Sequence, residues 1–177
     1  PKQSGNEDLG WEQTWANNVG LRLGFFNRAN LNIDFYHKKT SNMLMYVPES
    51  YAVTGEGSRW ENIGAMINRG VEISIDGDVI RTKDFAWNLN VNVSYNKNKL
   101  VELYNGVQEY VNSTTGLKYV VGHPVHEFFL NRYAGVNPAN GDALWYTKDG
   151  EITTEFREED KVMTGKTFDS PWAGGFG

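Results

Sequence analysis

The amino-acid sequence predicts an all-β fold of antiparallel up-and-down strands, a segment of a large transmembrane β-barrel with long extracellular loops. Three observations carry this prediction. Apolar and polar residues alternate with a period of two, and short turns alternate with very long connections. The composition is rich in aromatic residues (14%) and in glycine (19 residues). Successive side chains leave a strand on opposite sides, so the alternation gives each strand one apolar and one hydrated face.

The clearest alternation lies in two predicted strands, at about 70–80 and 85–96. In the first, Val71, Ile73 and Ile75 alternate with polar residues, and residues 81–84 make a polar break. The apolar face of the second strand is unbroken over six positions: Phe85, Trp87, Leu89, Val91, Val93 and Tyr95. Its opposite side is nearly a ladder of asparagines. Asparagine is a poor strand former, so this side is expected to face water.

Two more strands are predicted before these, at about 11–26 and 29–40, with a tight turn at 26–28. Pairing across that turn would place His37 near the level of Asn17. Each hairpin then has an apolar band that polar groups close at the end away from the turn. A further hairpin is predicted at about 128–147, and another strand starts at 173–177.

Connection lengths favour a membrane barrel over a soluble sandwich, whose open sheet face would show the same alternation. The turns at 26–28 and 81–84 are short, whereas the segments at about 41–69 and 97–172 are long and irregular. Loops of more than about 12–15 residues are uncommon in compact domains. Strict alternation of short and long connections is typical of outer-membrane barrels. A tilted spanning strand needs about 9–11 residues, which the stretch from Phe85 to Tyr95 supplies.

If the sheet belongs to such a barrel, the alternation predicts which side chains face lipid and which face a hydrated lumen. The expected lipid-facing residues are Val19, Leu21, Leu23, Leu31, Ile33, Phe35, Val71, Ile73, Ile75, Leu89, Val91 and Val93. The expected lumen-facing residues are Asn32, Asp34, Glu72, Ser74, Asn88, Asn90 and Asn92.

Composition excludes several classes of protein. The formal net charge of −5 argues against a generally basic nucleic-acid-binding protein, and the lack of cysteine removes disulfides and thiolate metal sites. No run of about 18 apolar residues predicts a transmembrane helix. The sequence begins at Pro1 and stops at Gly177 just as an apolar pattern restarts. We therefore interpret residues 1–177 as a partial barrel, a fragment of a longer protein.

Several motifs, taken together and in order, resemble the C-terminal barrel of the SusC/RagA family, the TonB-linked outer-membrane transporters of Bacteroidetes. The motifs are Asn68-Arg69-Gly70-Val71-Glu72-Ile73, Phe85-Ala86-Trp87-Asn88, Tyr95-Asn96-Lys97-Asn98-Lys99-Leu100, Val121-Gly122-His123-Pro124-Val125 and Gly135-Val136-Asn137-Pro138. The resemblance covers nearly the whole chain. The turn Lys148-Asp149-Gly150-Glu151 departs from it, because many relatives have a more acidic and glycine-richer turn there.

The resemblance implies a segment of a TonB-dependent importer in the cell outer membrane. Such importers take up large nutrients, typically oligosaccharides or peptides, through a plugged barrel. A SusD-like surface lipoprotein closes over the mouth, and the inner-membrane TonB complex drives import through parts absent from this chain. The alternative is a secreted, soluble β-sheet domain that binds carbohydrate or acts in adhesion. Neither function is enzymatic, and no nucleic-acid partner or cofactor is expected.

Loop aromatics are the candidate site residues for contact with a ligand or with the lid. They are Tyr46, Tyr51, Trp60, Tyr104, Tyr110 and Tyr119. Their rings have flat apolar faces and polar tips, which suit stacking on sugars or burial against a protein. The same rings could equally form small cores within the loops themselves.

Catalytic and metal sites are not expected. His123 and His126 have the spacing of a helical metal site, but Pro124 between them disfavours a helix, so two loop histidines are the simpler interpretation. Four residues could ligate calcium, yet turns need the same residue types: Asn137, Asn140, Asp142 and Asp149. The acidic run of Glu155, Glu158, Glu159 and Asp160 is expected to be a solvated face.

Overall fold

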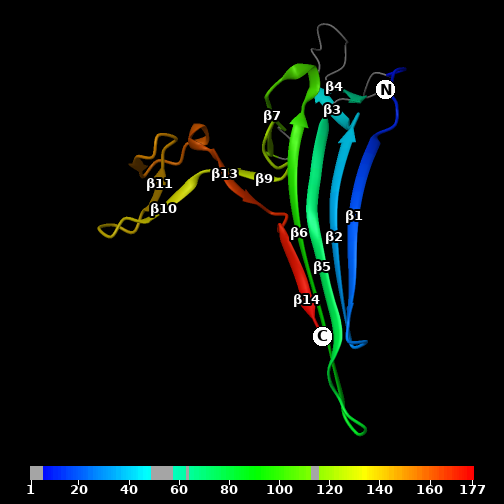
Figure 1. Cartoon of the computed structure of the whole chain (residues 1–177). Helices are drawn as coiled ribbons and strands as arrows, with labels where there is room; N and C mark the ends of the chain where they lie inside the picture. Colours follow the sequence, from blue (N-terminus) through cyan, green and yellow to red (C-terminus); the bar gives the residue numbers. More distant parts are fainter. Residues whose placement is uncertain (1–5, 49–57, 63, 113–115) are drawn as a thin grey trace.

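The computed structural model describes residues 6–48, 58–62, 64–112 and 116–177. Its main feature is one long antiparallel sheet with the strand order β1-β2-β5-β6-β14 (Figure 1). These strands are β1 (Gln13–Phe25), β2 (Ala29–Ser41), β5 (Ala65–Arg81), β6 (Ala86–Glu102) and β14 (Trp172–Phe176). The prediction of an all-β, antiparallel fold is therefore confirmed.

Strands β5 and β6 are longer than the sequence pattern predicts. Each has 17 residues, about 55 Å at a rise of about 3.3 Å per residue. Residues 65–69 and 97–102, which we expected in long irregular connections, continue the sheet instead. A tilted strand needs only about 9–11 residues to cross a bilayer, so β5 and β6 extend well beyond the apolar band.

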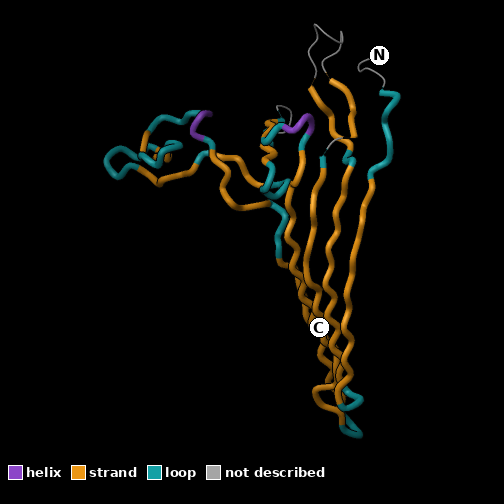
Figure 2. The backbone as a smooth tube through the Cα atoms, turned by 45° about the horizontal axis from the view of Figure 1, so that its top comes forward, coloured by secondary structure: helices purple, strands orange, loops and turns teal. Residues whose placement is uncertain are grey.

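Two tight turns lie together at one end of the sheet, and the long connections lie at the other end (Figure 2). At the first turn, Phe26 and Asn27 have φ of 52° and 54°, and the Arg28 amide donates to the Phe25 carbonyl at 2.9 Å. At the second, the Thr82 amide donates to the Phe85 carbonyl at 2.7 Å. A register shift between Asp78 and Ile80 precedes this second turn, so Ile80, rather than Val79, pairs with Trp87.

The pairing register aligns the apolar residues of all five strands into rows on one face. One row is Val19, Phe35, Val71, Tyr95 and Trp172, and the next contains Leu21, Ile33, Ile73 and Val93. The residues expected to face lipid all share this face, and those expected to face the lumen share the opposite face, whereas Phe85 lies just before β6 and has no strand partner. Asn17 pairs directly with His37, as the hairpin predicts.

Very little of the described chain is buried. Its buried hydrophobic residues are Ala65, Leu100 and Leu103, all at the loop end of the sheet. On the apolar face, by contrast, Val19 is 69% exposed and Leu21 50% exposed. Among the described residues, no helix is long and apolar enough to cross a membrane. Backbone pairing thus holds the sheet together, and its apolar face lies open.

The connections fold into small structures of their own. Hairpins form from β3 (Leu44–Pro48) with β4 (Ser58–Asn62) and from β7 (Glu109–Val111) with β8 (Lys118–Val120). A short 3-10 helix, η1 (Tyr104–Gly106), precedes β7. Farther along, β9 (Glu127–Leu130) pairs with β13 (Val162–Thr167). This pair leads to an outlying sheet of β10 (Arg132–Val136), β11 (Ala143–Tyr146) and β12 (Ile152–Thr153), with η2 (Glu158–Asp160) after it (Figure 1).

The hairpin predicted at 128–147 needs one correction. Only Arg132–Val136 pairs with Ala143–Tyr146, with a register shift between Tyr133 and Gly135. Residues Phe128 to Leu130 belong to β9, whose partner β13 lies about 30 residues later in the chain. A local pattern cannot reveal that partner.

Candidate functional site

The hydrated face of the sheet is a polar wall held by side-chain hydrogen bonds between strands. Asn30 donates to Asp76 at 2.9 Å, Asn32 donates to the Ser74 hydroxyl at 3.1 Å, and Asn88 donates to Asp78. Near the turns, a hollow of about 660 Å³ is lined by these same residue types, among them Asn30, Asp76, Asp78 and Asn90. The predicted asparagine ladder is thus a surface whose polar groups bridge strands and still contact water.

Two glycines on this face make room for larger neighbours. Tyr36 pairs with Gly70 across the ladder, and its hydroxyl reaches Asn96 on the next strand at 2.9 Å. A Cβ built on Gly70 would lie 2.6 Å from that hydroxyl and would also meet the Tyr95 carbonyl. Gly20 similarly faces Asp34, whose carboxylate would lie 2.5 Å from an added Cβ. Glycine is needed at these two positions because an added side chain would collide with a neighbouring side chain. It is not needed for an unusual backbone conformation.

The predicted loop aromatics meet in two separate pairs. Tyr46 and Trp60 are direct cross-strand partners in the β3–β4 hairpin, with ring centroids 5.3 Å apart. Tyr110 and Tyr119 are partners in the β7–β8 hairpin, with nearly parallel rings 6.3 Å apart. Tyr104 lies in η1, and Tyr51 lies outside the described residues. Each pair stabilises its own hairpin, and Tyr46 and Trp60 stay 44% and 43% exposed.

Sequence reasoning missed a third aromatic group, in the outlying sheet. The ring of Trp145 lies 5.6 Å from that of Tyr133 and 5.1 Å from that of Phe156, both edge-on. Tyr133 and Phe156 remain more than half exposed. The predicted pairing of residues 128–136 with 143–147 brings Tyr133 near Trp145, but the register shift between Tyr133 and Gly135 makes the two direct partners. Phe156 joins them only through the tertiary fold.

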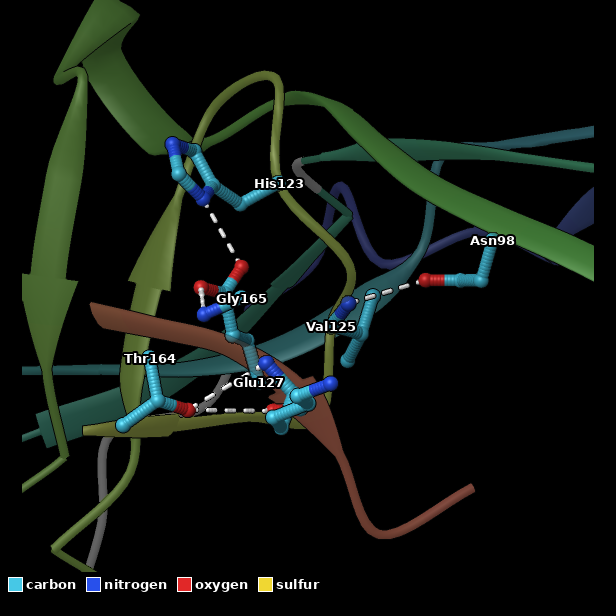
Figure 3. Close-up of polar contacts among 7 residues, drawn as sticks. Asn98, His123, Val125, Glu127, Thr164 and Gly165 are labelled. Atoms are coloured by element: carbon cyan, nitrogen blue, oxygen red, sulfur yellow. Dashed lines mark hydrogen bonds and ion pairs between the residues drawn. The ribbon is translucent and has the colours of Figure 1, made fainter. Parts of the chain in front are cut away.

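A buried carboxylate holds residues 123–127 against β13, and a separate hydrogen bond ties this segment to the long sheet (Figure 3). Glu127 is 2% exposed, and its carboxylate contacts His123 Nδ1 at 2.8 Å and accepts the Gly165 amide at 2.6 Å. The Val125 amide donates to Asn98 of β6 at 2.8 Å. These contacts join residues 123–127, β13 and the edge of β6 into one polar clamp.

The two histidines of the predicted H-x-x-H motif do not converge. His126 Nδ1 contacts Asp169 at 2.6 Å, and its ring stacks on Phe168 at 4.6 Å between centroids. His123 contacts Glu127 instead. Within the described residues, no group of three or more His, Asp or Glu side chains could hold a metal ion. Each histidine is a partner in the packing of a loop.

The asparagine-rich turn uses its side chains to hold its own backbone. Asn137 Oδ1 accepts the Ala139 amide at 3.0 Å, and Asn140 Oδ1 accepts the Asp142 amide at 3.1 Å. These bonds fit the turn role that the sequence suggested.

The expectation of a solvated acidic face is wrong for one residue. Asp160 is 7% exposed, and its carboxylate accepts the Lys148 amide at 2.8 Å.

Comparison with known proteins agrees with the geometry. Residues 2–174 match the family described as "TonB dependent receptor-like, beta-barrel". The chain is 34% identical over 151 residues to the TonB-dependent receptor SusC of Bacteroides thetaiotaomicron, which is 78% of this chain and 15% of that protein. It is 43% identical over 104 residues to the TonB-dependent receptor P39 of Formosa agariphila, which is 58% of this chain and 10% of that protein. The chain thus spans about a tenth to a seventh of these curated relatives.

Solved structures give the same result. One described as the RagAB peptide transporter has a TM-score of 0.88 and 32% identity over 98% of this chain and 20% of that chain. Another, of the RagAB peptide importer in the "open-open" state, has a TM-score of 0.90 and 33% identity over 99% of this chain. The similarity therefore includes the loops as well as the long sheet.

Proposed function

The chain belongs to the TonB-dependent receptor β-barrel family, a family of outer-membrane receptors rather than enzymes. From this premise we propose that it forms part of the wall and mouth of an outer-membrane importer of large nutrients. The observation that carries the proposal is the long sheet itself. It has one open apolar face, one hydrogen-bonded polar face and almost no core of its own.

In the proposed wall, the apolar face contacts lipid and the polar face lines the lumen. Plugged outer-membrane transporters have about 22 strands, of which this chain would supply five. The outer strands β1 and β14 each leave one backbone edge open in the described structure. Open edges tend to pair with further strands, and neighbouring strands of the same barrel are the partners we propose.

In the proposed mouth, the loop hairpins face the outside of the cell. Short turns are periplasmic and long loops extracellular in barrels of this kind, so the turns at 26–28 and 81–84 set the direction. The exposed pair of Tyr46 and Trp60 and the half-buried pair of Tyr110 and Tyr119 then lie where the nutrient and a SusD-like lipoprotein would meet the barrel. The RagAB structures, described as a peptide transporter, support a peptide as one substrate class. Oligosaccharides are the other class that this family suggests. TonB would act through parts of the protein outside this chain.

A secreted soluble domain is the alternative function, and it requires a cover for the apolar face. The described residues provide no such cover: Phe35, Ile75 and Trp172 of that face are 56%, 45% and 60% exposed. Soluble monomers rarely expose apolar patches beyond a few hundred Å². The membrane barrel accounts for this exposure directly.

Cysteine labelling in whole cells tests the proposed topology. In the full-length transporter, a cysteine at Glu109 should react with a membrane-impermeant maleimide added outside, and one at Asn27 should react only after the periplasm is opened. A cysteine at Val91 should not react with the impermeant maleimide from either side of the membrane, but should react with a lipid-soluble probe. Labelling of Asn27 from outside would reverse the topology, and aqueous labelling of Val91 would reject the lipid-facing wall.

Loop replacement tests the proposed mouth. Residues 108 and 121 are joined by a hydrogen bond of 2.9 Å from the Val121 amide to the Gln108 carbonyl, so a short Gly-Ser linker can replace 109–120 without stretching the chain. We expect weaker nutrient uptake or weaker co-purification of the lipoprotein with the barrel still folded, because loops contribute little to strand pairing. Replacement of the distant turn residues 137–142 is the matched control for loop shortening. Unchanged uptake and unchanged co-purification would reject a role for the β7–β8 hairpin.

A further inference from the structure

A row of basic side chains crosses three neighbouring strands at the edge of the apolar band. His37, Arg69 and Lys97 are direct partners on β2, β5 and β6. In the next row toward the loops, Lys39 and Lys99 flank Ile67. Strands lie about 4.8 Å apart and same-face rows about 7 Å apart. The five basic groups therefore occupy a patch of roughly 10 by 7 Å, on a chain whose net charge is −5.

These basic residues share the outward face with the apolar rows. Directly below them along the strands lie Phe35, Val71 and Tyr95, the last row of the apolar band on β2, β5 and β6. A shallow hollow of about 450 Å³ spans the junction, and both rows line it. The hollow thus has a basic rim on the loop side and an apolar floor on the side of the band. This combination fits an amphiphile with an anionic head.

Among the described residues, no acidic side chain pairs with the lysines and the arginine of this patch. Within the described part of the chain, Lys39, Arg69, Lys97 and Lys99 take part in none of the ion pairs. Arg69 and Lys97 are exposed. Glu72, three residues from Arg69, faces the lumen side, and Asp169 above β14 is engaged by His126 at 2.6 Å. Like charges opposite one another in a sheet are destabilising, so a bound anion would relieve this repulsion.

We propose that His37, Arg69 and Lys97, with Lys39 and Lys99, bind the phosphate group of an acylated lipid in the outer leaflet. The inference rests on the proposed function, because it requires the apolar face to meet lipid. A guanidinium binds phosphate through two parallel hydrogen bonds, and lysines add point charges. The acyl chains would lie on Phe35, Val71 and the rows below. A water-soluble anion would contact only the basic rim. A hollow with a basic rim and an apolar floor favours a ligand that has both an anionic head and acyl chains.

The test compares two lipid probes on the full-length transporter that contains this segment, purified in mild detergent. Native mass spectrometry would measure binding of diphosphorylated lipid A and of the same lipid with both phosphates removed. We expect clear preference for the phosphorylated form. Arg69→Gln with Lys97→Gln should weaken its binding about 30-fold, since each cation near an anionic lipid surface contributes about a fivefold effect. Arg69→Lys with Lys97→Arg should retain most of the binding.

Lys38→Gln is the matched control, because Lys38 lies between His37 and Lys39 on the same strand but on the lumen face. This substitution removes one positive charge at the same level along the strand, and it should leave lipid binding unchanged. Equal binding of both lipid forms, or wild-type binding by the double glutamine variant, would overturn the inference. Complete displacement by millimolar inorganic phosphate would also overturn it, because the site would then recognise a free anion.

Failure of this inference can be told apart from failure of the proposed function. A transporter that takes up nutrient, keeps Val91 in lipid and shows no preference for phosphorylated lipid would disprove only the lipid site. Aqueous labelling of Val91 would disprove the wall on which both proposals depend. Variants that do not fold would be recognised by loss of uptake together with protease sensitivity, and the conservative Arg69→Lys, Lys97→Arg pair still tests the charge.

Discussion

The hydroxyl of Tyr36 donates a hydrogen bond to Asn96 Oδ1 at 2.9 Å, and the bond passes over Gly70 on the strand between them. One aromatic side chain therefore connects β2 to β6 across β5, at the loop end of the apolar band. The link exists because Gly70 has no side chain. It locks the register at the level where the basic row begins.

Adding a side chain at Gly70 should break this link. In Gly70→Ala, the new Cβ meets the Tyr36 hydroxyl and the Tyr95 carbonyl, and the backbone atom cannot move cheaply. We expect a loss of about 1–3 kcal/mol in unfolding free energy, which is typical of overpacking. Urea unfolding of the full-length barrel in detergent would measure it.

Gly24→Ala is the control for that substitution. Gly24 lies on the same face, and its nearest neighbour would be Asn30 Oδ1 at an ordinary 3.8 Å from an added Cβ. Tyr36→Phe separates the hydrogen bond from the packing and should cost less than about 1.5 kcal/mol. Equal stability of the Gly70 and Gly24 variants would contradict the role assigned to Gly70.

Arginine substitutions on the two faces of β6 should differ strongly. Val91 lies on the apolar face and Asn90 on the polar face, one residue apart in the same strand. Val91→Arg should cost about 2–4 kcal/mol near the bilayer midplane, and Asn90→Arg should cost far less. Folding yield into lipid vesicles, followed by unfolding titration, compares them. Equal tolerance at both positions would refute the lipid-facing assignment.

Removal of the buried Glu127 carboxylate should destabilise the polar clamp without disrupting the long sheet. Glu127→Ala leaves the Gly165 amide without its acceptor and frees His123. A hydrogen bond to a charged group contributes about 1.5–3 kcal/mol. Hydrogen exchange of residues 123–127 and 162–167 should therefore speed up, while exchange in β5 and β6 stays slow.

Glu109→Ala is the matched carboxylate control for the clamp. Glu109 forms an ion pair with Lys118 at 2.9 Å, but its side chain is 60% exposed. Exposed pairs contribute about 0–1 kcal/mol, so exchange at 123–127 should not change. Slow exchange of the clamp in Glu127→Ala would show that the backbone pairing of β9 with β13 is sufficient.

The exposed aromatic pair of the first loop hairpin should affect nutrient capture more than stability. Tyr46→Ala with Trp60→Ala removes two half-exposed rings from a hairpin outside the long sheet. We expect reduced uptake or reduced lipoprotein association, and an unchanged barrel-unfolding midpoint. Tyr133→Ala with Phe156→Ala, in the outlying sheet, shows whether the effect belongs to one aromatic group or to both. Normal uptake in every variant would mean that the rings serve only their own hairpins.

Local pattern was sufficient for the strands and their faces. The period of two in residues 85–96 fixes which side chains share a side, because side-chain direction alternates along any strand. A short turn fixes register equally well, so the pairing of Asn17 with His37 followed from the position of residues 26–28. The family resemblance rested on short motifs of the same local kind, and the family match over residues 2–174 confirms it.

What the sequence by itself determined, then, is the all-β class, the two-faced strands, the tight turns and the family. Only the tertiary structure decided which distant residues meet: β9 with β13, Asp160 with the Lys148 amide, Tyr36 with Asn96, and the basic row of His37, Arg69 and Lys97. Each of these contacts joins segments more than ten residues apart. Long connections join β9 to β13 and β2 to β5, so a local period does not record the register of either pair, and Tyr36 reaches Asn96 only because Gly70 leaves space.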